Sequence, residues 1–534
     1  MNTSREQTIE ELDQSNRVPV TGPARFHSIL FPGAHGADAQ QTSDVPAFFH
    51  DLNLDQIVEA ITSEWRDYNL LPFFCTPLSD LRAIAYRQSV MKDLEGDALM
   101  RAIQAFSEGM RQMREIQPHA KDHYYKYESE RRFLDAAAIY CRVVNDLSEE
   151  LSRLDLASNG MRAFRAYLAN YVSSARFHEL SAETTALLSD LSSIHYCLVI
   201  KDGNVTVRRY DSEEDYSAVV ERVFAKFRQA GARDYRVKNL GSGGMNHIQA
   251  QVVEQLARLY PDIFDRMVAF SSAHADYLDE TISRFDREIQ FYVAYLTHIA
   301  RFRRAGLSFC YPRLSRTSKE VESRNSFDLA LAANLLKDEA TVVTNDFFLR
   351  GPERILVVSG PNQGGKTTFA RMFGQLHYLA CLGCPIPGTK ARLFLFDRLF
   401  THFEKEEDIE TLRGKLAEDL VRVRRILDQA TPNSIVVMNE VFSSTTLKDA
   451  VYLSKEIMAR LSALDLLGVC VTFLDEIASF NEKTVSVVST VDPDNPAIRT
   501  YKLVRKPADG LAYALAIAEK HRVTYDWLRK RMTS

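Results

Sequence analysis

A glycine-rich segment between an apolar run and a helical pattern constrains this 534-residue chain more than any other feature. The apolar run Ile355–Ser359 predicts a buried strand, and Gly360-Pro-Asn-Gln-Gly-Gly-Lys-Thr367 follows it at once. This segment matches the P-loop pattern G-x-x-x-x-G-K-[ST], between a strand and a helix as that pattern requires. A coincidental glycine turn is the weaker interpretation. We therefore expect an α/β domain with a parallel sheet around the motif.

The residue types in this motif predict contacts with a nucleoside triphosphate and its metal ion. Glycines let the backbone wrap the phosphates, and the helix N-terminus adds positive potential. Lys366 is expected to reach the β- and γ-phosphates, and Thr367 to offer its hydroxyl to Mg²⁺. The predicted cofactors are therefore ATP and Mg²⁺. The predicted nucleotide-binding set is Gly360, Pro361, Asn362, Gln363, Gly364, Gly365, Lys366, Thr367 and Thr368.

A second polar group is predicted at the end of another strand. The apolar run that starts at Ser434 ends in Asn439 and Glu440, about 70 residues after the P-loop. A P-loop enzyme needs acidic groups at the end of a neighbouring strand, to hold the metal's water shell and to orient the attacking water. Glu440 is therefore the candidate catalytic residue, and Asn439 joins Thr367 as a candidate metal-site residue. The alternative, that both residues only cap a strand, is the weaker one.

The composition of the chain argues against collagen-like, low-complexity and wholly disordered proteins. Hydrophobic residues make up 46% of the chain and charged residues 26%, which are globular proportions. The net charge of -5 does not indicate nucleic acid as a partner, although a local basic surface would suffice. Seven scattered cysteines do not resemble a disulfide framework, and the pair Cys381 and Cys384 is best interpreted as structural. Without a signal peptide or a long apolar run, we expect a cytoplasmic protein with no membrane partner.

The pattern of hydrophobic and polar residues changes along the sequence and predicts a multidomain chain. Residues 1–44 are polar and aperiodic, so we expect a mobile leader. Residues 45–326 are mainly helical in pattern, with a clear amphipathic helix over 133–154 and a β-hairpin insertion within 194–240. Residues 327–534 alternate short apolar runs with helices, as an α/β domain does.

Four segments resemble motifs of the MutS family of DNA mismatch-repair ATPases. Ser359–Thr368 is very similar to the family's G-P-N-M-G-G-K-S-T, a narrower pattern than a general P-loop. Asp397–Thr401 resembles its D-R-I-F-T, and Met438–Val441 resembles its M-D-E-I. Asp509–Ala518 resembles the closing S-Y-G-L-A-V-A segment. The resemblance is strong over the last 200 residues or so and weaker before them.

The resemblance implies an architecture and partners. Residues 327–534 would form an ABC-type P-loop ATPase domain that dimerises with composite nucleotide sites. Residues 45–326 would form an α-helical core and lever domain, and the insertion near 194–240 would stand in the place of the family's DNA clamp. The implied partners are duplex or branched DNA, a second copy in a homodimer, and repair-pathway proteins.

This chain also departs from the family's pattern. Asn439 stands where the family has Asp, which removes a full charge near Mg²⁺. Thr411–Lys415 replaces a G-R-S-T segment, so Gly414 and Lys415 take the place of the hydroxyl expected on the partner's γ-phosphate. Phe473 follows Thr472 where the family has His. These changes put hydrolysis activated by a dimer partner in doubt, although not nucleotide binding.

Two functions from different classes follow. The leading one is a MutS-like, ATP-dependent DNA-binding ATPase related to mismatch repair, in which ATP drives lever or clamp movement on duplex or branched DNA. We expect it to lack the N-terminal mismatch-recognition domain and an appended nuclease domain. The alternative is a nucleotide-binding, weakly hydrolysing dimeric module that holds a protein partner. A motor or transporter ATPase of another family is a third, weaker interpretation.

Overall fold

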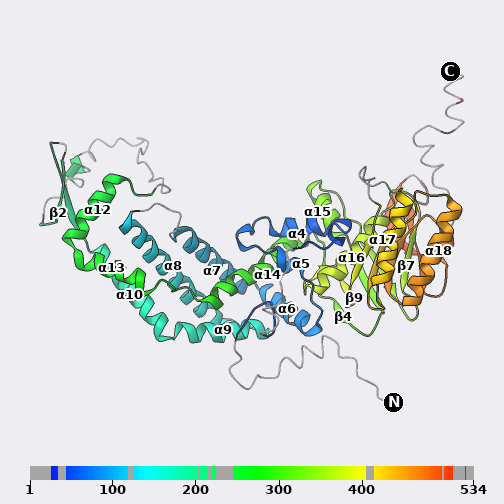
Figure 1. The fold of residues 1–534 in the computed structure, drawn as a ribbon, viewed down its shortest axis with the longest axis horizontal. Coiled ribbons are helices and arrows are strands. Elements are labelled where there is room, and N and C mark those ends of the chain that lie inside the picture. The colour runs from blue at the N-terminus through cyan, green and yellow to red at the C-terminus, as the bar shows by residue number, and fades with distance from the viewer. Residues whose placement is uncertain are drawn as a thin grey trace, which may run out of the picture. The chain divides into compact units, whose positions relative to one another are not determined.

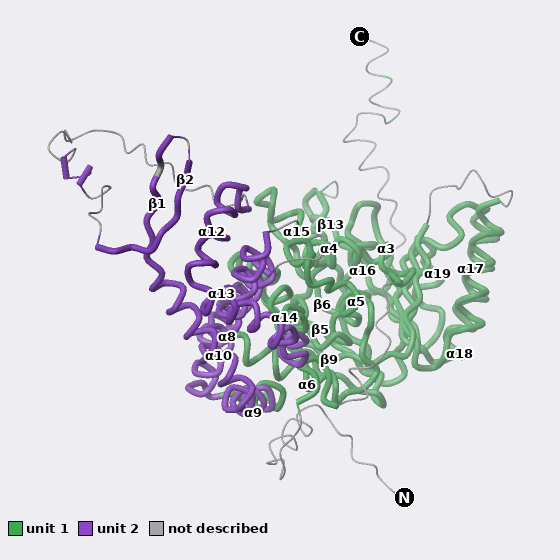
Figure 2. Tube along the Cα trace, turned by 60° about the vertical axis from the view of Figure 1, so that its left-hand side comes forward, with its two compact units in different colours: residues 1–95, 156–162, 287–534 green, residues 96–155, 163–286 purple. Residues whose placement is uncertain are grey.

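The computed structural model describes most of the chain, in two compact units (Figures 1 and 2). The described residues are 26–33, 44–117, 125–202, 204–212, 219–220, 222–223, 244–404, 414–495, 498–508, 524 and 529. Unit 1 takes those within 1–95, 156–162 and 287–534, and unit 2 takes those within 96–155 and 163–286. The predicted mixture of helical and sheet-containing parts is confirmed at this level.

Unit 2 is a set of packed helices with one hairpin. Its helices are α7 (Asp97–Ile116), α8 (Lys126–Arg153), α10 (Ala175–Ser192), α12 (His247–Leu259) and α13 (Pro261–Ala273), with parts of α9 (Asn159–Val172) and α14 (Glu280–Arg304). The helix predicted over 133–154 lies almost wholly in α8. Helices α7 and α8 pack closely, because a Cβ on Gly109 would lie only 2.2 Å from Val143 Cγ1.

The hairpin predicted from sequence is present in unit 2. Strands β1 (Tyr196–Lys201) and β2 (Asn204–Arg209) pair antiparallel, with Leu198 opposite Val207. Asp202 has the left-handed φ of 54° that a tight hairpin turn uses. Most of the remaining 194–240 insertion lies outside the described residues.

Unit 1 contains the other sheets of the described residues. Its helices are α3 (Phe48–Asp51), α4 (Leu54–Thr62), α5 (Leu71–Cys75), α6 (Leu81–Leu94), α15 (Leu329–Lys337), α16 (Lys366–Cys381), α17 (Lys415–Gln429), α18 (Leu447–Leu464) and α19 (Asp475–Ala478), with the remaining parts of α9 and α14 and a short 3-10 turn at Arg66–Tyr68. Its strands are β3 (Phe309–Cys310), β4 (Arg313–Ser315), β5 (Val321–Ser326), β6 (Asn345–Leu349), β7 (Ile355–Ser359), β8 (Ile386–Pro387), β9 (Lys390–Phe394), β10 (Leu399–His402), β11 (Ile435–Asn439), β12 (Leu467–Val471), β13 (Thr484–Val491) and β14 (Arg499–Arg505).

Among the described residues, the main sheet has six strands in the order β10-β11-β12-β7-β13-β14. All neighbours pair parallel except β13 and β14, which pair antiparallel. Ile355 and Val357 of β7 pack in one cluster with apolar residues of α17, α18 and α19. Because side chains alternate along a strand, Leu356 and Val358 face the opposite side of the sheet. All of β7 is buried, as expected for a central parallel strand.

Two smaller sheets complete unit 1, and they begin earlier in the chain than expected. Strands β4 and β5 lie before residue 327, yet both pair with β9 in a four-stranded sheet of order β4-β9-β5-β6. The other small sheet joins β3 to β8. The sequence of β5, VESRNS, is mostly polar, so its pattern gave no sign of a strand.

Residues 26–33 belong to the stretch for which we expected a mobile leader, but they are anchored within unit 1. Ile29 and Leu30 are fully buried. Tyr292 Oη donates to Ile29 O at 2.7 Å, and the buried Arg87 Nε donates to Leu30 O at 3.1 Å. Glu288 accepts from the Ile29 N–H at 2.9 Å. A few apolar residues were enough to hold this segment, although they formed no periodic pattern.

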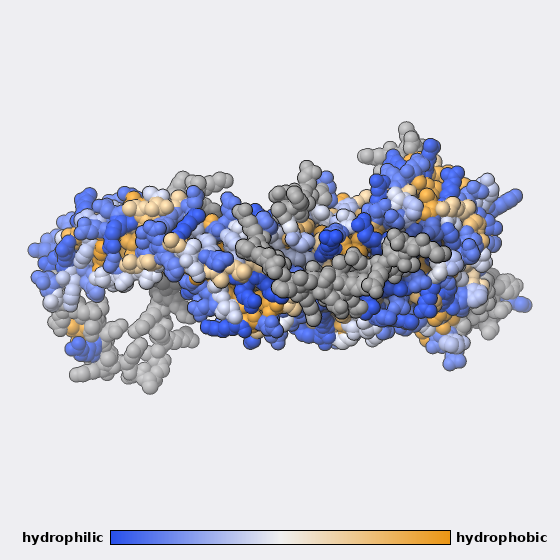
Figure 3. Space-filling model, turned by 90° about the horizontal axis from the view of Figure 1, so that it is seen from below, coloured by the Kyte–Doolittle hydropathy of each residue, from blue (hydrophilic) through white to orange (hydrophobic). Residues whose placement is uncertain are grey.

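One face of the described surface is mainly polar (Figure 3). Hydrophilic side chains cover most of this face in Figure 3, with smaller hydrophobic patches between them. Within the described ranges, no helix combines the length and the apolar character needed to cross a bilayer.

Candidate nucleotide-binding site

The glycine-rich loop, residues 360–365, joins β7 to α16 in unit 1, as the sequence predicted. Gly360 and Gly365 have φ values of 114° and 89°, which glycine adopts without the usual steric cost. Gln363 also has a positive φ, 59°, which is uncommon for a residue with a side chain. The chain therefore turns sharply at the carboxyl end of a buried parallel strand, with the N-terminus of a 16-residue helix directly behind it.

Lys366 lies inside this loop. Its side-chain ammonium donates to Gly360 O at 3.0 Å and to Pro361 O at 3.2 Å, and the residue is only 4% exposed. Nζ also lies 4.3 Å from the centroid of the Phe473 ring. Burial lowers the pKa of Lys366, while the nearby Glu440 carboxylate raises it. The ammonium is thus positioned where the loop curves.

The two candidate metal-site residues lie in contact. Thr367 Oγ1 donates to Asn439 Oδ1 at 2.9 Å, although the two residues are 72 positions apart. Asn439 is the last residue of β11, and all five residues of that strand are buried. A hydroxyl and an amide oxygen are hard ligands that suit Mg²⁺, which usually takes few protein ligands beside water and phosphate oxygens. This donor set therefore fits the predicted ion.

Glu440 follows Asn439 and lies at the same end of the sheet. Its backbone has a φ of 55°, and its N–H donates to Val471 O of β12 at 2.9 Å. Such a conformation is costly for a residue with a side chain, and it persists only where the surroundings fix it. Burial raises the pKa of Glu440, Lys366 lowers it, and Glu404 raises it. The carboxylate thus interacts electrostatically with the loop lysine.

Two residues that the sequence did not single out hold the loop, one from β13 and one from β14. The buried Ser489 Oγ of β13 donates to Gly364 O at 2.6 Å. A Cβ on Gly364 would lie 2.3 Å from that oxygen, so glycine is required there. Arg499 Nε of β14 donates to Asn362 O at 3.2 Å. Both residues lie more than a hundred positions from the loop, and no local pattern marks them.

An apolar cavity of about 270 Å³ adjoins the loop, and the sequence did not predict it either. Its apolar and aromatic lining includes Phe327, Val342, Val343, Phe369, Met372 and Tyr501, beside Gly365 and Thr368. Tyr501 has a φ of 57°, and its carbonyl accepts from Asn345 Nδ2 at 3.0 Å. The cavity thus offers a mainly apolar space next to the start of α16.

Lys415, one of the positions that depart from the family's pattern, makes a defined contact in the structure. Its ammonium forms an ion pair with Glu404 of the same chain, and Ser443 Oγ donates to that carboxylate at 3.2 Å. Lys415 is the first residue of α17, and Gly414 precedes it as the N-cap. Residues 411–413 of the same segment lie outside the described residues. In this structure, Lys415 is therefore engaged by a carboxylate of its own chain.

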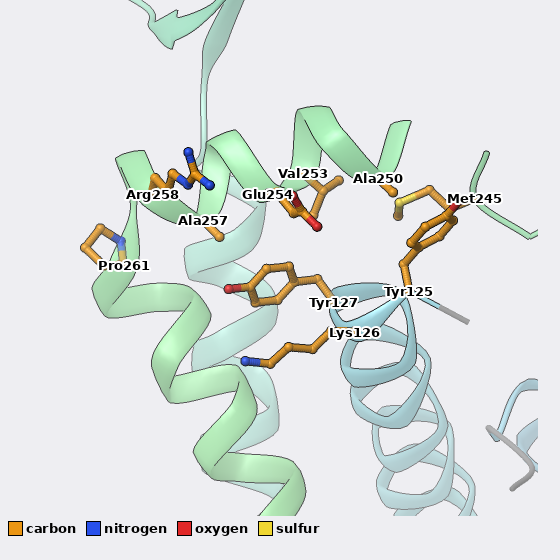
Figure 4. Close-up of a pocket in the computed structure, with 10 residues that line it drawn as sticks. All are labelled: Tyr125, Lys126, Tyr127, Met245, Ala250, Val253, Glu254, Ala257, Arg258 and Pro261. Atoms are coloured by element: carbon orange, nitrogen blue, oxygen red, sulfur yellow. The ribbon is translucent and has the colours of Figure 1, made fainter. Parts of the chain in front are cut away.

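A larger cavity, of about 450 Å³, lies in unit 2 and contains none of the predicted site residues (Figure 4). Tyr125, Lys126 and Tyr127, at the start of α8, line one side of it, and Val253, Ala257 and Arg258 of α12 line another. Within the ranges that the structure describes, neither unit groups three or more His, Cys, Asp or Glu side chains as a metal site. The chemistry-bearing residues therefore gather at the glycine-rich loop.

Comparison with known proteins finds a family match for the part of the chain that contains the glycine-rich loop. A family model described as MutS domain V matches residues 356–526. The chain is 27% identical over 199 residues to the DNA mismatch repair protein MutS of Petrotoga mobilis, an alignment that covers 37% of this chain and 23% of that protein. It is 32% identical over 180 residues to the endonuclease MutS2 of Thermus thermophilus, covering 33% of this chain and 24% of the relative.

A third relative extends the alignment. The DNA mismatch repair protein MutS of Chloroflexus aurantiacus is 26% identical over 257 residues, which cover 48% of this chain and 25% of that protein. The matched part of the chain thus spans about a quarter of the length of these curated relatives. The domain V match and these relatives together show that the part of the chain around the glycine-rich loop is similar to domain V of MutS proteins.

Proposed function

We propose that this chain binds ATP with Mg²⁺ at the glycine-rich loop, hydrolyses it, and uses the cycle to control binding to DNA. One observation carries the proposal. Lys366, the Thr367–Asn439 hydrogen bond and Glu440 meet at the carboxyl ends of β7 and β11, two parallel strands that lie on either side of β12 in one sheet. Ligands bind in this position in open parallel α/β sheets. The match to MutS domain V supports the same assignment.

The residues take the following roles in this proposal. Backbone N–H groups of residues 362–368 and the Lys366 ammonium bind the phosphates. Thr367 and Asn439 hold Mg²⁺, which when bound neutralises charge on the phosphate oxygens. Glu440 accepts a hydrogen bond from the attacking water and orients it. Because Asn439 is neutral, we expect turnover to be slow.

The apolar cavity beside the loop suits the base of the nucleotide. It adjoins Gly365 and Thr368, so a ligand whose phosphates lie on the loop would reach it. The flat Tyr501 side chain lies at this cavity and suits an aromatic ring as partner. We therefore place adenine there.

The proposal that DNA is a partner rests on the named relatives and on the hairpin of unit 2. The relatives named above include DNA mismatch repair proteins. The hairpin of unit 2 carries Lys201 and Arg208, both exposed, and cations of this kind bind phosphate backbones. We propose duplex or branched DNA as the ligand, and a homodimer as the acting form, assisted by repair-pathway proteins.

A second function has its own supporting observations. Asn439 lacks the charge expected at the metal site, Lys415 pairs with Glu404 of its own chain, and Phe473 lies against the loop lysine. These features favour a nucleotide-binding module with little hydrolysis, whose nucleotide state controls association with a protein partner.

Steady-state ATP hydrolysis, measured with and without duplex DNA, separates the two functions. Glu440→Gln is the informative variant, because it keeps the shape of the side chain and removes its charge. We expect slow turnover that changes with DNA, and that Glu440→Gln lowers without loss of ATP binding. ATP binding without turnover, and without any effect of DNA, would favour the protein-binding module. Turnover that survives in Glu440→Gln would contradict the role of this residue.

A further inference from the structure

We infer that the Phe473 ring holds the Lys366 ammonium against the loop's own carbonyls and opposes the transfer of this ammonium to a phosphate. We call the Phe473 ring in this role the aromatic shutter. This inference rests on the proposed nucleotide site and deepens it, because it names a residue that sets the site's affinity. The contact that carries it is the 4.3 Å separation between Lys366 Nζ and the centroid of the Phe473 ring.

The ammonium is fully engaged in this arrangement. It has three N–H donors, and the carbonyls of Gly360 and Pro361 accept at 3.0 and 3.2 Å. The face of the Phe473 ring supplies the remaining partner, since an aromatic face attracts a cation. Asn362 Oδ1 adds a longer contact at 3.5 Å. A phosphate can therefore gain this ammonium only by displacing partners that it already has.

The charges around Lys366 do not remove this competition. The Glu440 carboxylate attracts the ammonium, and the Arg499 guanidinium repels it. The ring contributes attraction without any net charge, and it does so in a site where water is largely excluded, because Lys366 is only 4% exposed. Cation–π attraction is stronger under such conditions than at an open surface.

The ring can move without a change in the backbone. The Thr472 N–H donates to Val358 O of the adjacent β7 at 3.0 Å, and the Leu474 N–H donates to Thr472 Oγ1 at 3.0 Å. These bonds fix the chain on both sides of Phe473. The residue itself is 51% exposed, so rotation about its side-chain bonds can swing the ring toward solvent. The closed and open positions of the shutter are thus two rotamers.

The shutter lowers the apparent affinity for nucleotide, because only the open fraction of molecules offers a free ammonium. The test is equilibrium titration of the full chain with a fluorescent ATP analogue and Mg²⁺. Phe473→Ala removes the ring, and Phe473→Leu keeps apolar bulk without an aromatic face. We expect both variants to bind about three- to tenfold more tightly than the unmodified chain, as loss of a cation–π contact implies. Tyr452→Ala, which removes an aromatic side chain 65% exposed on α18, is the matched control and should bind unchanged.

The outcomes separate this inference from the proposed function. If Phe473→Ala binds with unchanged or weaker affinity, or if Phe473→Leu behaves like the unmodified chain, there is no aromatic shutter. If neither the unmodified chain nor Phe473→Ala binds the analogue, the nucleotide site itself is wrong. Thermal melting of each variant confirms that it is folded, which we expect because the Phe473 side chain is half exposed.

Discussion

At the scale of single residues, Asn439 is the position where this chain differs most clearly from an ordinary metal site of its kind. The Thr367 hydroxyl already donates to it at 2.9 Å, so the geometry of the pair is in place. Only the charge is missing. A carboxylate at this position would attract the ion and accept the same hydrogen bond with greater strength.

Asn439→Asp should therefore lower the Mg²⁺ concentration needed for half-maximal ATP binding, by about tenfold, the usual size of such effects near a metal. Titration of Mg²⁺ at fixed ATP measures this shift. Asn433→Asp makes the same chemical change at an exposed position before β11 and should leave the midpoint unchanged. An unchanged midpoint in Asn439→Asp would contradict the assignment of this residue to the metal site.

Ser489 offers a second test, because its buried hydroxyl is the partner of the loop carbonyl of Gly364. Ser489→Ala should weaken nucleotide binding about fivefold, the value of one hydrogen bond of about 1 kcal/mol. Ser486, on the same strand, has a buried Oγ without a hydrogen-bond partner in the described part of the chain. Ser486→Ala should leave binding unchanged and raise the melting temperature, since it removes an unsatisfied polar group. Equal effects of the two variants on binding would show that Ser489 has no specific role.

The sequence predicted the residues whose signal is local. Lys366 and Thr367 belong to a contiguous motif, and Glu440 follows a recognisable apolar strand. The sequence could not predict Ser489 or the contact of Phe473 with Lys366, because each depends on which strands become neighbours of β7. That order is set by packing of the whole sheet and not by spacing along the chain.

At the scale of elements, an ionic cluster joins the end of α18 to the strands beside it. The Asp465 carboxylate lies 2.8 Å from Lys483 Nζ, 3.1 Å from Lys319 Nζ and 3.1 Å from Arg354 Nε. Burial raises the pKa of Asp465, but the hydrogen bonds from Lys483 and Lys319 outweigh it and lower the pKa from 3.8 to about 2. The cluster thus favours the ionised carboxylate in the folded chain.

Asp465→Asn should destabilise unit 1 at neutral pH by about 1 kcal/mol, a discounted value because the carboxylate is about one-third exposed to water. Asp465 has a φ of 58°, and asparagine tolerates that conformation, so the variant tests charge alone. Because the folded-state pKa lies below the unfolded one, the stabilisation is present above about pH 4 and is lost as pH falls toward 2. Melting curves between these pH values should therefore converge for the two proteins. A constant difference would contradict the ionic origin.

Elements with strong patterns were predicted and weak ones were not. The hairpin of β1 and β2 has apolar residues in both strands on either side of a turn, and α8 has a long apolar stripe. Strand β5 has three exposed or half-exposed polar positions and is defined by its partners β6 and β9. Its formation depends on a strand more than sixty residues later, which no local pattern indicates.

At the scale of the whole molecule, the chain combines a helical unit with a unit built on a six-stranded sheet. The chemistry that we propose lies entirely in unit 1, and the basic hairpin that we propose for DNA lies in unit 2. The account as a whole depends on whether the glycine-rich loop binds nucleotide, since the DNA control and the Phe473 shutter both assume it.

Direct ATP binding by the full chain, compared with Lys366→Ala in the presence of Mg²⁺, tests that claim most directly. Isothermal titration measures both without requiring turnover. We expect saturable binding by the unmodified chain and about 100-fold weaker binding by the variant, as the loss of charged hydrogen bonds to phosphate implies. Folding of the variant is checked by its melting curve. Equal affinity of the two proteins would contradict the account at its centre.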